Sequence, residues 1–478
     1  MTTRLREWQT ECLRQLHAAF DAQRDFLVTA TPGAGKTTLA LAFAYELVRQ
    51  GKIDHIHVVA PTRPIRKHWQ DAAEAWGLRL GRRSNVRLRN GSLPIDIGGV
   101  ATTYSQVAQE PDAHAVSVEA RLALAILDEC HHSGDRRAWG EGVKEAFEGA
   151  RFRLHLSGTP FRQDGNVIPF IGYGPDGVSR SDFPYRYSRA IAENVCRPVL
   201  FQSYDALVQY KHRGEKFSVT FSDDVPQKQM SEVLRFALHP EAGLIEQMVR
   251  DADDEISAKR ARGARWTDAA GLLVAMNQAH AYECAKIIHS VTGEEPMVVV
   301  SDSETAEDDL LAFRDGMGRW IVAVRMISEG VDIPRLMVAV YATNVIATLF
   351  FRQFVGRVVR VRHQGMEEVA AIFLPHDERL MREAADIEAE IKQFLKDVPD
   401  SFPAVRNALA AKTRHASNVV PTVSEIEAQG QTYRGEAFST VDLAYAESVR
   451  HLFPRGDQLA AVQIAYTLRM LDVRQPAA

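Results

Sequence analysis

The sequence contains little cysteine for its 478 residues. Its four cysteines lie far apart, and none belongs to a C-x-x-C pattern. Small secreted domains are usually rich in disulfides, and structural zinc sites usually use closely spaced cysteine and histidine ligands. We therefore expect neither a disulfide framework nor a zinc site, and we expect the chain to work in a reducing compartment.

Long apolar runs and an excess of one charge are also missing. No run of 18 apolar residues is present, and the opening MTTRLREWQ lacks the apolar core of a signal peptide. We therefore expect a cytoplasmic protein without a membrane partner. The formal net charge is −5, so any attraction to nucleic acid must come from local groups.

Apolar runs alternate with helix-like segments in two separate parts of the chain. The first series is FLVTA, IHVVAP, GGVATTY, LALAILDE and FRLHLSGTP, and the second is GLLVAM, PMVVVS, WIVAV, MVAVYAT and VAAIFLP. This alternation is typical of α/β doubly wound parallel sheets, whose functional loops follow the carboxyl ends of the strands. We predict two such domains in tandem, over residues 1–195 and 266–395.

The other segments show weaker patterns. Residues 196–265 mix a short strand-like stretch, KFSVTF, with charged helices, which indicates a linker or small insertion. Residues 396–478 follow a polar, helix-like pattern, which predicts a helical C-terminal extension. The six tryptophans are expected mainly in the core rather than on a ligand-binding surface.

A glycine-rich loop follows the first apolar run. Ala30 to Thr37 reads A-x-x-G-x-G-K-T, close to the phosphate-binding pattern G-x-x-x-x-G-K-[ST]. Such a loop presents backbone N–H groups and a helix N-terminus to phosphates, its lysine reaches the β- and γ-phosphates, and its hydroxyl holds Mg²⁺. The predicted nucleotide-binding residues of this loop are Thr31, Pro32, Gly33, Ala34, Gly35, Lys36, Thr37 and Thr38.

A pair of carboxylates lies about ninety residues after the glycine-rich loop, in LDECHH, where it follows a predicted buried strand. Asp128 is placed at the strand end to hold Mg²⁺, and Glu129 beside it could polarise an attacking water molecule. His131 and His132 raise the possibility of a metal site, but no further ligands are spaced to join them.

The DECH sequence resembles motif II of superfamily 2 helicases, and the other motifs of that family occur in order. They are LREWQTECL, APTRPIRKHW, ATTYSQV, LSGTPFR, LLVAMNQAHA, AVRMISEGVDIP and FRQFVGRVVR, and the resemblance covers residues 5 to 365. The sequences LSGTPFR and AVRMISEGVDIP resemble the corresponding motifs in the branch of the family that holds restriction-enzyme motor subunits and XPB-like proteins. They differ from those of DEAD-box RNA helicases.

This resemblance implies two RecA-like domains, ATP and Mg²⁺ as cofactors, and site residues in each motif. Gln9 would read adenine, Gly330 and Asp332 would contact ATP, and Gln353, Arg357 and Arg360 would act in catalysis. Because Arg357 and Arg360 lie on the second domain, hydrolysis would require closure of the interdomain cleft and so drive a mechanical stroke. The residues implied to couple hydrolysis to movement are Ser157, Gly158, Thr159 and His131.

The implied partner is DNA, duplex or single-stranded, held mainly by its phosphates because a motor must ignore base sequence. The candidate contacts are Thr62, Arg63, Thr102, Thr103, Tyr104 and Asn277, although the threonines could equally serve as helix caps or pack in strands. Two alternatives remain open. The chain could be an RNA-dependent ATPase, or it could be the motor module of a larger restriction or phage-defence complex, with a partner such as a nuclease.

Overall fold

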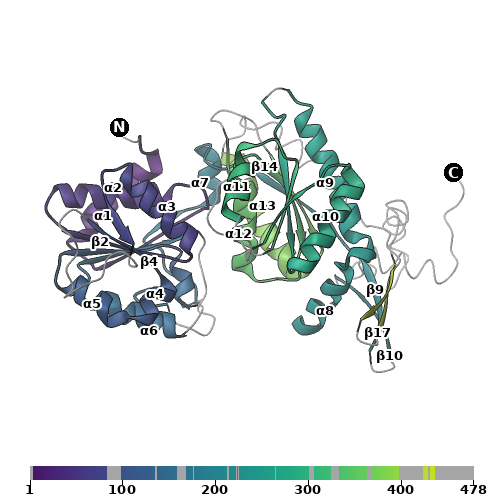
Figure 1. The fold of residues 1–478 in the computed structure, drawn as a ribbon, viewed down its shortest axis with the longest axis horizontal. Helices are drawn as coiled ribbons and strands as arrows, with labels where there is room; N and C mark the ends of the chain where they lie inside the picture. Colours follow the sequence, from purple (N-terminus) through teal and green to yellow (C-terminus); the bar gives the residue numbers. More distant parts are fainter. Residues whose placement is uncertain are drawn as a thin grey trace, which may run out of the picture. The chain divides into compact units, whose positions relative to one another are not determined.

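The chain forms two compact units, Met1–Cys196 and Arg197–Ala478, in a computed structural model (Figure 1). The structure describes residues 4–82, 98–134, 137–158, 168–175, 177–212, 215–221, 223, 225–263, 265–300, 306–324, 333–362, 369–397, 424–428 and 431–436. Within these ranges no helix is long and apolar enough to cross a membrane.

The first unit is built on a seven-stranded parallel sheet with the order β3-β4-β2-β5-β6-β1-β7. Its strands are β1 (Asp25–Ala30), β2 (His55–Ala60), β3 (Leu80–Arg82), β4 (Gly99–Thr103), β5 (Ala123–Leu127), β6 (Phe152–Ser157) and β7 (Phe183–Tyr185). The central strands β2, β5 and β6 are buried along their whole length, as expected for parallel strands covered on both faces.

Helices cover both faces of this sheet. They are α1 (Glu7–Phe20), α2 (Lys36–Arg49), α3 (Arg63–Glu74), α4 (Tyr104–Gln109), α5 (Pro111–Glu119), α6 (Arg137–Phe147) and α7 (Tyr187–Ala192). Figure 1 shows α1, α2 and α3 on one face and α4, α5 and α6 on the other. Because β6 lies between β1 and β5, the loops that follow these three strands are neighbours at the carboxyl edge of the sheet.

The second unit contains a six-stranded parallel sheet with the order β12-β13-β11-β14-β15-β8. Its strands are β8 (Val199–Tyr204), β11 (Ala270–Ala275), β12 (Met297–Val299), β13 (Trp320–Val324), β14 (Leu336–Ala342) and β15 (Ala370–Pro375). The helices are α8 (Gln227–Ala237), α9 (Leu244–Arg260), α10 (Gln278–Thr292), α11 (Ala306–Asp315), α12 (Thr348–Val358) and α13 (Glu378–Asp397). Two parallel-sheet α/β domains are thus confirmed, and Trp8, Trp69 and Trp320 are fully buried, as predicted.

The segment expected to be a linker or small insertion, residues 196–265, differs from that prediction. Its first strand, β8, pairs with β15 as the edge strand of the second sheet, and α9 packs on β14 and β15. Only three of the six residues of β8 are fully buried, namely Val199, Phe201 and Tyr204. An edge strand of this kind lacks the continuous apolar run that marks a central parallel strand, which is why the pattern was weak.

A smaller antiparallel sheet also crosses the predicted boundaries. It has the order β10-β9-β17-β16, from β9 (Leu207–His212), β10 (Glu215–Thr220), β16 (Ser424–Ala428) and β17 (Gln431–Glu436). The prediction of a helical extension over 396–478 is therefore wrong for the two strands β16 and β17. Polar and apolar residues alternate in SEIEA, a pattern that suits a strand exposed on one face.

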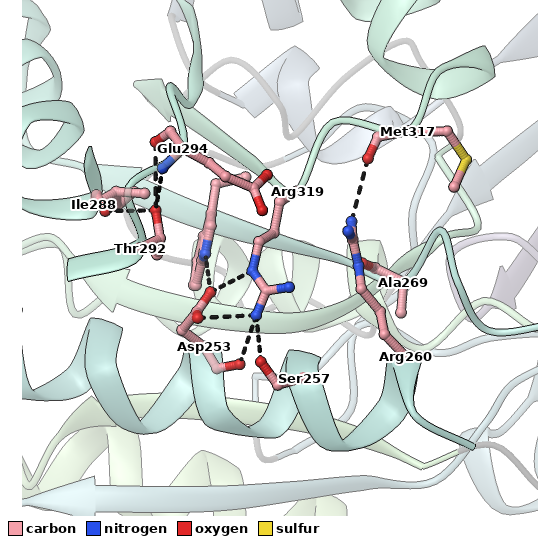
Figure 2. Close-up of polar contacts among 10 residues, drawn as sticks. Asp253, Ser257, Arg260, Ala269, Ile288, Thr292, Glu294, Met317 and Arg319 are labelled. Carbon is pink, nitrogen blue, oxygen red and sulfur yellow. Dashed lines mark hydrogen bonds and ion pairs between the residues drawn. The ribbon is translucent and has the colours of Figure 1, made fainter. Parts of the chain in front are cut away.

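A buried ion pair lies where strands of the second sheet begin, at the edge opposite to Asn277. Figure 2 shows Arg319 beside Asp253 and Ser257 of α9. The Asp253 carboxylate accepts hydrogen bonds from Arg319 Nε at 2.6 Å and from Trp320 Nε1 at 2.9 Å, and Ser257 Oγ lies 2.6 Å from the guanidinium. These contacts hold α9 against the start of β13.

Candidate active site

The loop after β1 has the backbone that a phosphate-binding loop requires. Gly33 and Gly35 adopt φ values of +81° and +94°, which side-chain-bearing residues rarely adopt. Gly35 is the N-cap of α2, so the free N–H groups of the first helical turn open toward this loop. Lys36 is the first residue of α2, and its ammonium donates a hydrogen bond to the Ala30 carbonyl at 3.1 Å.

Glu129 is drawn to this loop from the end of β5. Its Oε1 atom lies 3.1 Å from Lys36 Nζ, and its Oε2 atom accepts a hydrogen bond from the Gly158 N–H at 2.9 Å. Glu129 also has a φ of +46°, a conformation that is uncommon for residues other than glycine. Such strained backbone persists where surrounding contacts determine it, and it is often found at functional sites.

The pKa values of the two carboxylates in the DECH sequence are shifted in opposite directions. Burial raises the pKa of Glu129, but Lys36, His131 and the Gly158 N–H together lower that pKa to about 2. Burial and the charge of Glu129 raise the pKa of Asp128 to about 6. Glu129 is therefore ionised at neutral pH, and Lys36 balances its charge.

Asp128 is 7% exposed and is held from two sides. Its Oδ2 atom accepts a hydrogen bond from Trp69 Nε1 at 2.7 Å, and its carbonyl oxygen accepts one from the Tyr104 hydroxyl at 3.0 Å. The remaining carboxylate oxygen and the Thr37 hydroxyl are hard oxygen donors, which is the ligand chemistry that Mg²⁺ prefers. The residues present therefore fit the predicted magnesium ion in their chemistry.

His131 lies between the two predicted motifs at the ends of β5 and β6. Its Nδ1 atom is 3.2 Å from Ser157 Oγ and 3.6 Å from Glu129 Oε2. Gly158 is also in van der Waals range of this cluster, since a Cβ there would lie 3.5 Å from Lys36 Nζ. These residues are in contact with one another, their role in coupling stays a prediction, and Thr159 lies outside the described residues. In the part of the chain that is described, no group of three His, Cys, Asp or Glu side chains could hold a metal ion.

Gln9 contacts the phosphate-binding loop and is almost completely buried, with 2% of its surface exposed. Its Oε1 accepts a hydrogen bond from the Arg6 N–H at 2.8 Å, and its Nε2 donates one to the Gly35 carbonyl at 2.9 Å. The Arg6 guanidinium donates to the carbonyls of Gly33 and Ala34 at 3.2 and 2.7 Å. Both ends of the Gln9 amide are thus used within the protein, and its reading of adenine stays a prediction.

The candidate nucleic-acid contacts divide by burial. Thr102 is fully buried and its hydroxyl donates to the Val58 carbonyl, so its contact with a nucleic acid stays a prediction that this burial does not favour. The Tyr104 side chain is buried as well and points to Asp128. Thr102 lies in β4, whose five residues are all buried, and Tyr104 is the first residue of α4. Among these motif residues, Arg63 at the start of α3 is exposed.

Three further candidates lie at helix starts. Thr103 is the N-cap of α4, where its hydroxyl accepts a hydrogen bond from the Gln106 N–H, and Asn277 caps α10 by accepting one from the His280 N–H at 3.0 Å. Thr62 is the N-cap residue of α3, without a hydrogen bond from its side chain to the helix. Capping is therefore one function of Thr103 and Asn277, and the nucleic-acid contacts of all three stay predictions.

The second unit carries the last predicted motif on α12 and the residues after it. Gln353 and Arg357 are half-buried on this helix, and Arg360 follows its end. Arg197 connects the segment after α12 to the start of β14, because its guanidinium donates hydrogen bonds to the carbonyls of Arg360 and Pro334. Gly330 and Asp332 lie outside the described residues.

The sequence did not predict the contacts that Arg6, Trp69 and Arg197 make at these sites. Arg6 and Trp69 lie inside motifs that were recognised, LREWQTECL and APTRPIRKHW, but no spacing rule indicated that they contact the phosphate-binding loop and Asp128. Arg197 lies in the segment interpreted as a linker. Each contact joins residues that are distant in sequence, so only the packing of the sheet shows it.

Comparisons with known proteins agree with the motif order. The family described as "Type III restriction enzyme, res subunit" matches residues 2–162. An uncharacterised protein of Mycobacterium tuberculosis (strain CDC 1551 / Oshkosh) is 41% identical over 396 residues, which cover 82% of this chain but 64% of the relative. The "DNA 3'-5' translocase XPB2" of Sulfurisphaera tokodaii is 24% identical, over 74% of this chain and 78% of its own length.

The fold is similar to that of an HsdR subunit fragment of a type I restriction enzyme from Vibrio vulnificus. The TM-score is 0.55 at 15% sequence identity, and the match covers 79% of this chain and 65% of the fragment. The fold, the ordered motifs and the family match agree with one another. The chain is therefore similar to helicase-like proteins of superfamily 2 in its motif order and its fold.

Proposed function

We propose that the chain is a Mg²⁺-dependent ATPase that couples ATP hydrolysis to movement along DNA, as a helicase or a double-strand translocase. The similarity to restriction-enzyme subunits and to a translocase supports an ATPase activity. The observation that carries the proposal is the position of Glu129, 3.1 Å from Lys36 and hydrogen-bonded to Gly158. A carboxylate next to the phosphate-binding lysine is suited to orient a water molecule toward the γ-phosphate.

Each residue of this site has a distinct task in the proposed reaction. Lys36 leaves Glu129 to bind the β- and γ-phosphates, and the released carboxylate accepts a proton from the attacking water molecule. Thr37 and Asp128 would hold Mg²⁺, which neutralises charge on the phosphates when it is bound. His131 contacts both Glu129 and Ser157, so a movement of the Glu129 carboxylate would displace His131 and, through it, Ser157.

The Sulfurisphaera relative is named as a DNA translocase, and this favours DNA as the partner. We propose that Thr62 and Arg63 contact phosphates at the exposed start of α3. Phosphate contacts make binding independent of base sequence and steeply dependent on salt. An RNA-dependent ATPase is the rival proposal, and steady-state ATPase rates with duplex DNA, single-stranded DNA and RNA distinguish the two.

The same assay tests the site. Wild-type protein should be stimulated by DNA of any sequence, and Glu129→Gln should lower the rate by about 10²- to 10⁴-fold while still binding ATP. Glu148→Gln, the same change on an exposed side chain of the first unit, should leave the rate unchanged. Normal turnover by Glu129→Gln would remove this residue as the base, and stimulation by RNA alone would refute the proposal for DNA.

A second proposal is that the chain serves as the motor module of a restriction or phage-defence complex and is inactive alone. It is supported by the match to the family described as a restriction-enzyme subunit. Co-purification of a nuclease from the native host, together with ATPase activity that appears only in the complex, would distinguish this case from an autonomous motor.

A further inference from the structure

Two hydrogen bonds connect Asp128 to the helices that begin the predicted nucleic-acid-binding motifs. Trp69 of α3 donates its indole N–H to Asp128 Oδ2 at 2.7 Å. Tyr104, the first residue of α4, donates its hydroxyl to the Asp128 carbonyl at 3.0 Å. Trp69 and Tyr104 are both 0% exposed and Asp128 is 7% exposed. A buried bond of this kind is costly to break, because little water can replace the lost partner.

These two helices are also joined to each other. They follow β2 and β4, which are neighbouring parallel strands with Ala60 paired to Thr103. The Arg66 guanidinium of α3 donates to Gln106 Oε1 of α4 at 3.1 Å. Gln106 Oε1 in turn accepts from the Thr103 N–H at 3.1 Å. A ligand that displaces the start of either helix would therefore act on both.

Trp69 lies six residues after Arg63, less than two helical turns from the exposed end of α3. Over so short a length a helix moves as a rigid body, so displacement of its N-terminus changes the distance from the indole N–H to the carboxylate. We propose that Trp69 is a positioning residue, through which a nucleic acid bound at the start of α3 sets the orientation of Asp128 toward Mg²⁺ and the nucleotide. This inference rests on the proposed function.

Such coupling is an equilibrium property and is reciprocal. If nucleic acid favours the arrangement of Asp128 that binds Mg²⁺–nucleotide, it must tighten nucleotide binding by the same factor by which nucleotide tightens nucleic-acid binding. A tryptophan that only fills the core would give no such factor, because loss of its N–H would then weaken the fold without changing the ratio of the affinities.

The test is a binding cycle rather than a rate. The dissociation constant of a non-hydrolysable ATP analogue, with Mg²⁺, is measured with and without a fluorescent duplex DNA for wild type, Trp69→Phe and Trp76→Phe. Trp76 lies just past the end of α3, and its ring packs on Tyr45, so it is a matched control for loss of an indole. Wild type and Trp76→Phe should show at least about a fivefold change in the affinity for the analogue on adding DNA.

Trp69→Phe should reduce this factor to below about twofold, while its affinity for DNA without nucleotide stays equal to that of wild type. Wild-type coupling that Trp69→Phe retains would overturn the inference and leave the proposed function intact. Absence of DNA binding by the wild-type protein would overturn both. If Trp69→Phe fails to bind the analogue at all, Tyr104→Phe decides, because it removes the other bond to Asp128 and must also show reduced coupling.

Discussion

Replacing Asp253 with asparagine removes one charge from the ion pair at the base of the second unit. The Asp253 carboxylate is 17% exposed and its partner Arg319 is 10% exposed, so the charge of Arg319 recovers only part of its hydration when the carboxylate is lost. The same carboxylate also accepts the indole N–H of Trp320 at 2.9 Å. Breaking a buried pair costs about 3–5 kcal/mol, because the remaining charge is left uncompensated.

Two features of this site lower that figure. Both side chains retain some contact with water, and the amide oxygen of asparagine can still accept one of the hydrogen bonds. We therefore expect Asp253→Asn to lower the free energy of unfolding of the second unit by about 2–4 kcal/mol. Urea unfolding followed by circular dichroism gives this difference as a shift in the midpoint of the affected transition.

The same helix provides the control. Glu246 of α9 also forms an ion pair, with Arg250 at 2.7 Å, but the two side chains are 53% and 52% exposed. An exposed pair at this spacing contributes only about 0.3–0.5 kcal/mol, so Glu246→Gln should shift the midpoint slightly. Equal shifts in the two variants would refute the reasoning that burial, rather than charge pairing itself, determines the cost.

Three further outcomes are expected. Burial lowers the pKa of His55 from 6.5 to about 4. The neutral form of His55 therefore contributes about 3 kcal/mol to the free energy of unfolding above pH 6.5, and this contribution is lost as the pH falls toward 4. The unfolding midpoint should fall less steeply with decreasing pH in His55→Phe than in the wild type. Gly35→Ala places a Cβ 2.7 Å from Gln9 Nε2 at a φ of +94°, and should weaken ATP binding in a nucleotide titration. Arg357→Ala or Arg360→Ala should slow hydrolysis by about 10³- to 10⁵-fold with ATP affinity retained, and normal rates in both variants would exclude them as catalytic groups.

Local patterns in the sequence were sufficient for the two parallel sheets and for the phosphate-binding loop. A central parallel strand is buried on both faces, so it appears as a continuous apolar run, and the five runs found in each half correspond to strands of the two sheets. Gly33 and Gly35 could be recognised from the sequence because the local backbone of the loop requires positive φ values at these positions, which favour glycine. The order of the motifs then indicated the resemblance to superfamily 2 helicases.

Tertiary structure alone decided which of the recognised residues meet. The order β5-β6-β1 brings Glu129 to Lys36 and Gly158, although these residues are separated by some ninety and thirty positions in the chain. The neighbouring order β4-β2-β5 buries Thr102 and directs Trp69 to Asp128. Strand order and edge pairing depend on contacts between distant segments, which local periodicity does not encode. For the same reason β8 joins the second sheet, and β16 and β17 join β9, where sequence indicated a linker and a helix.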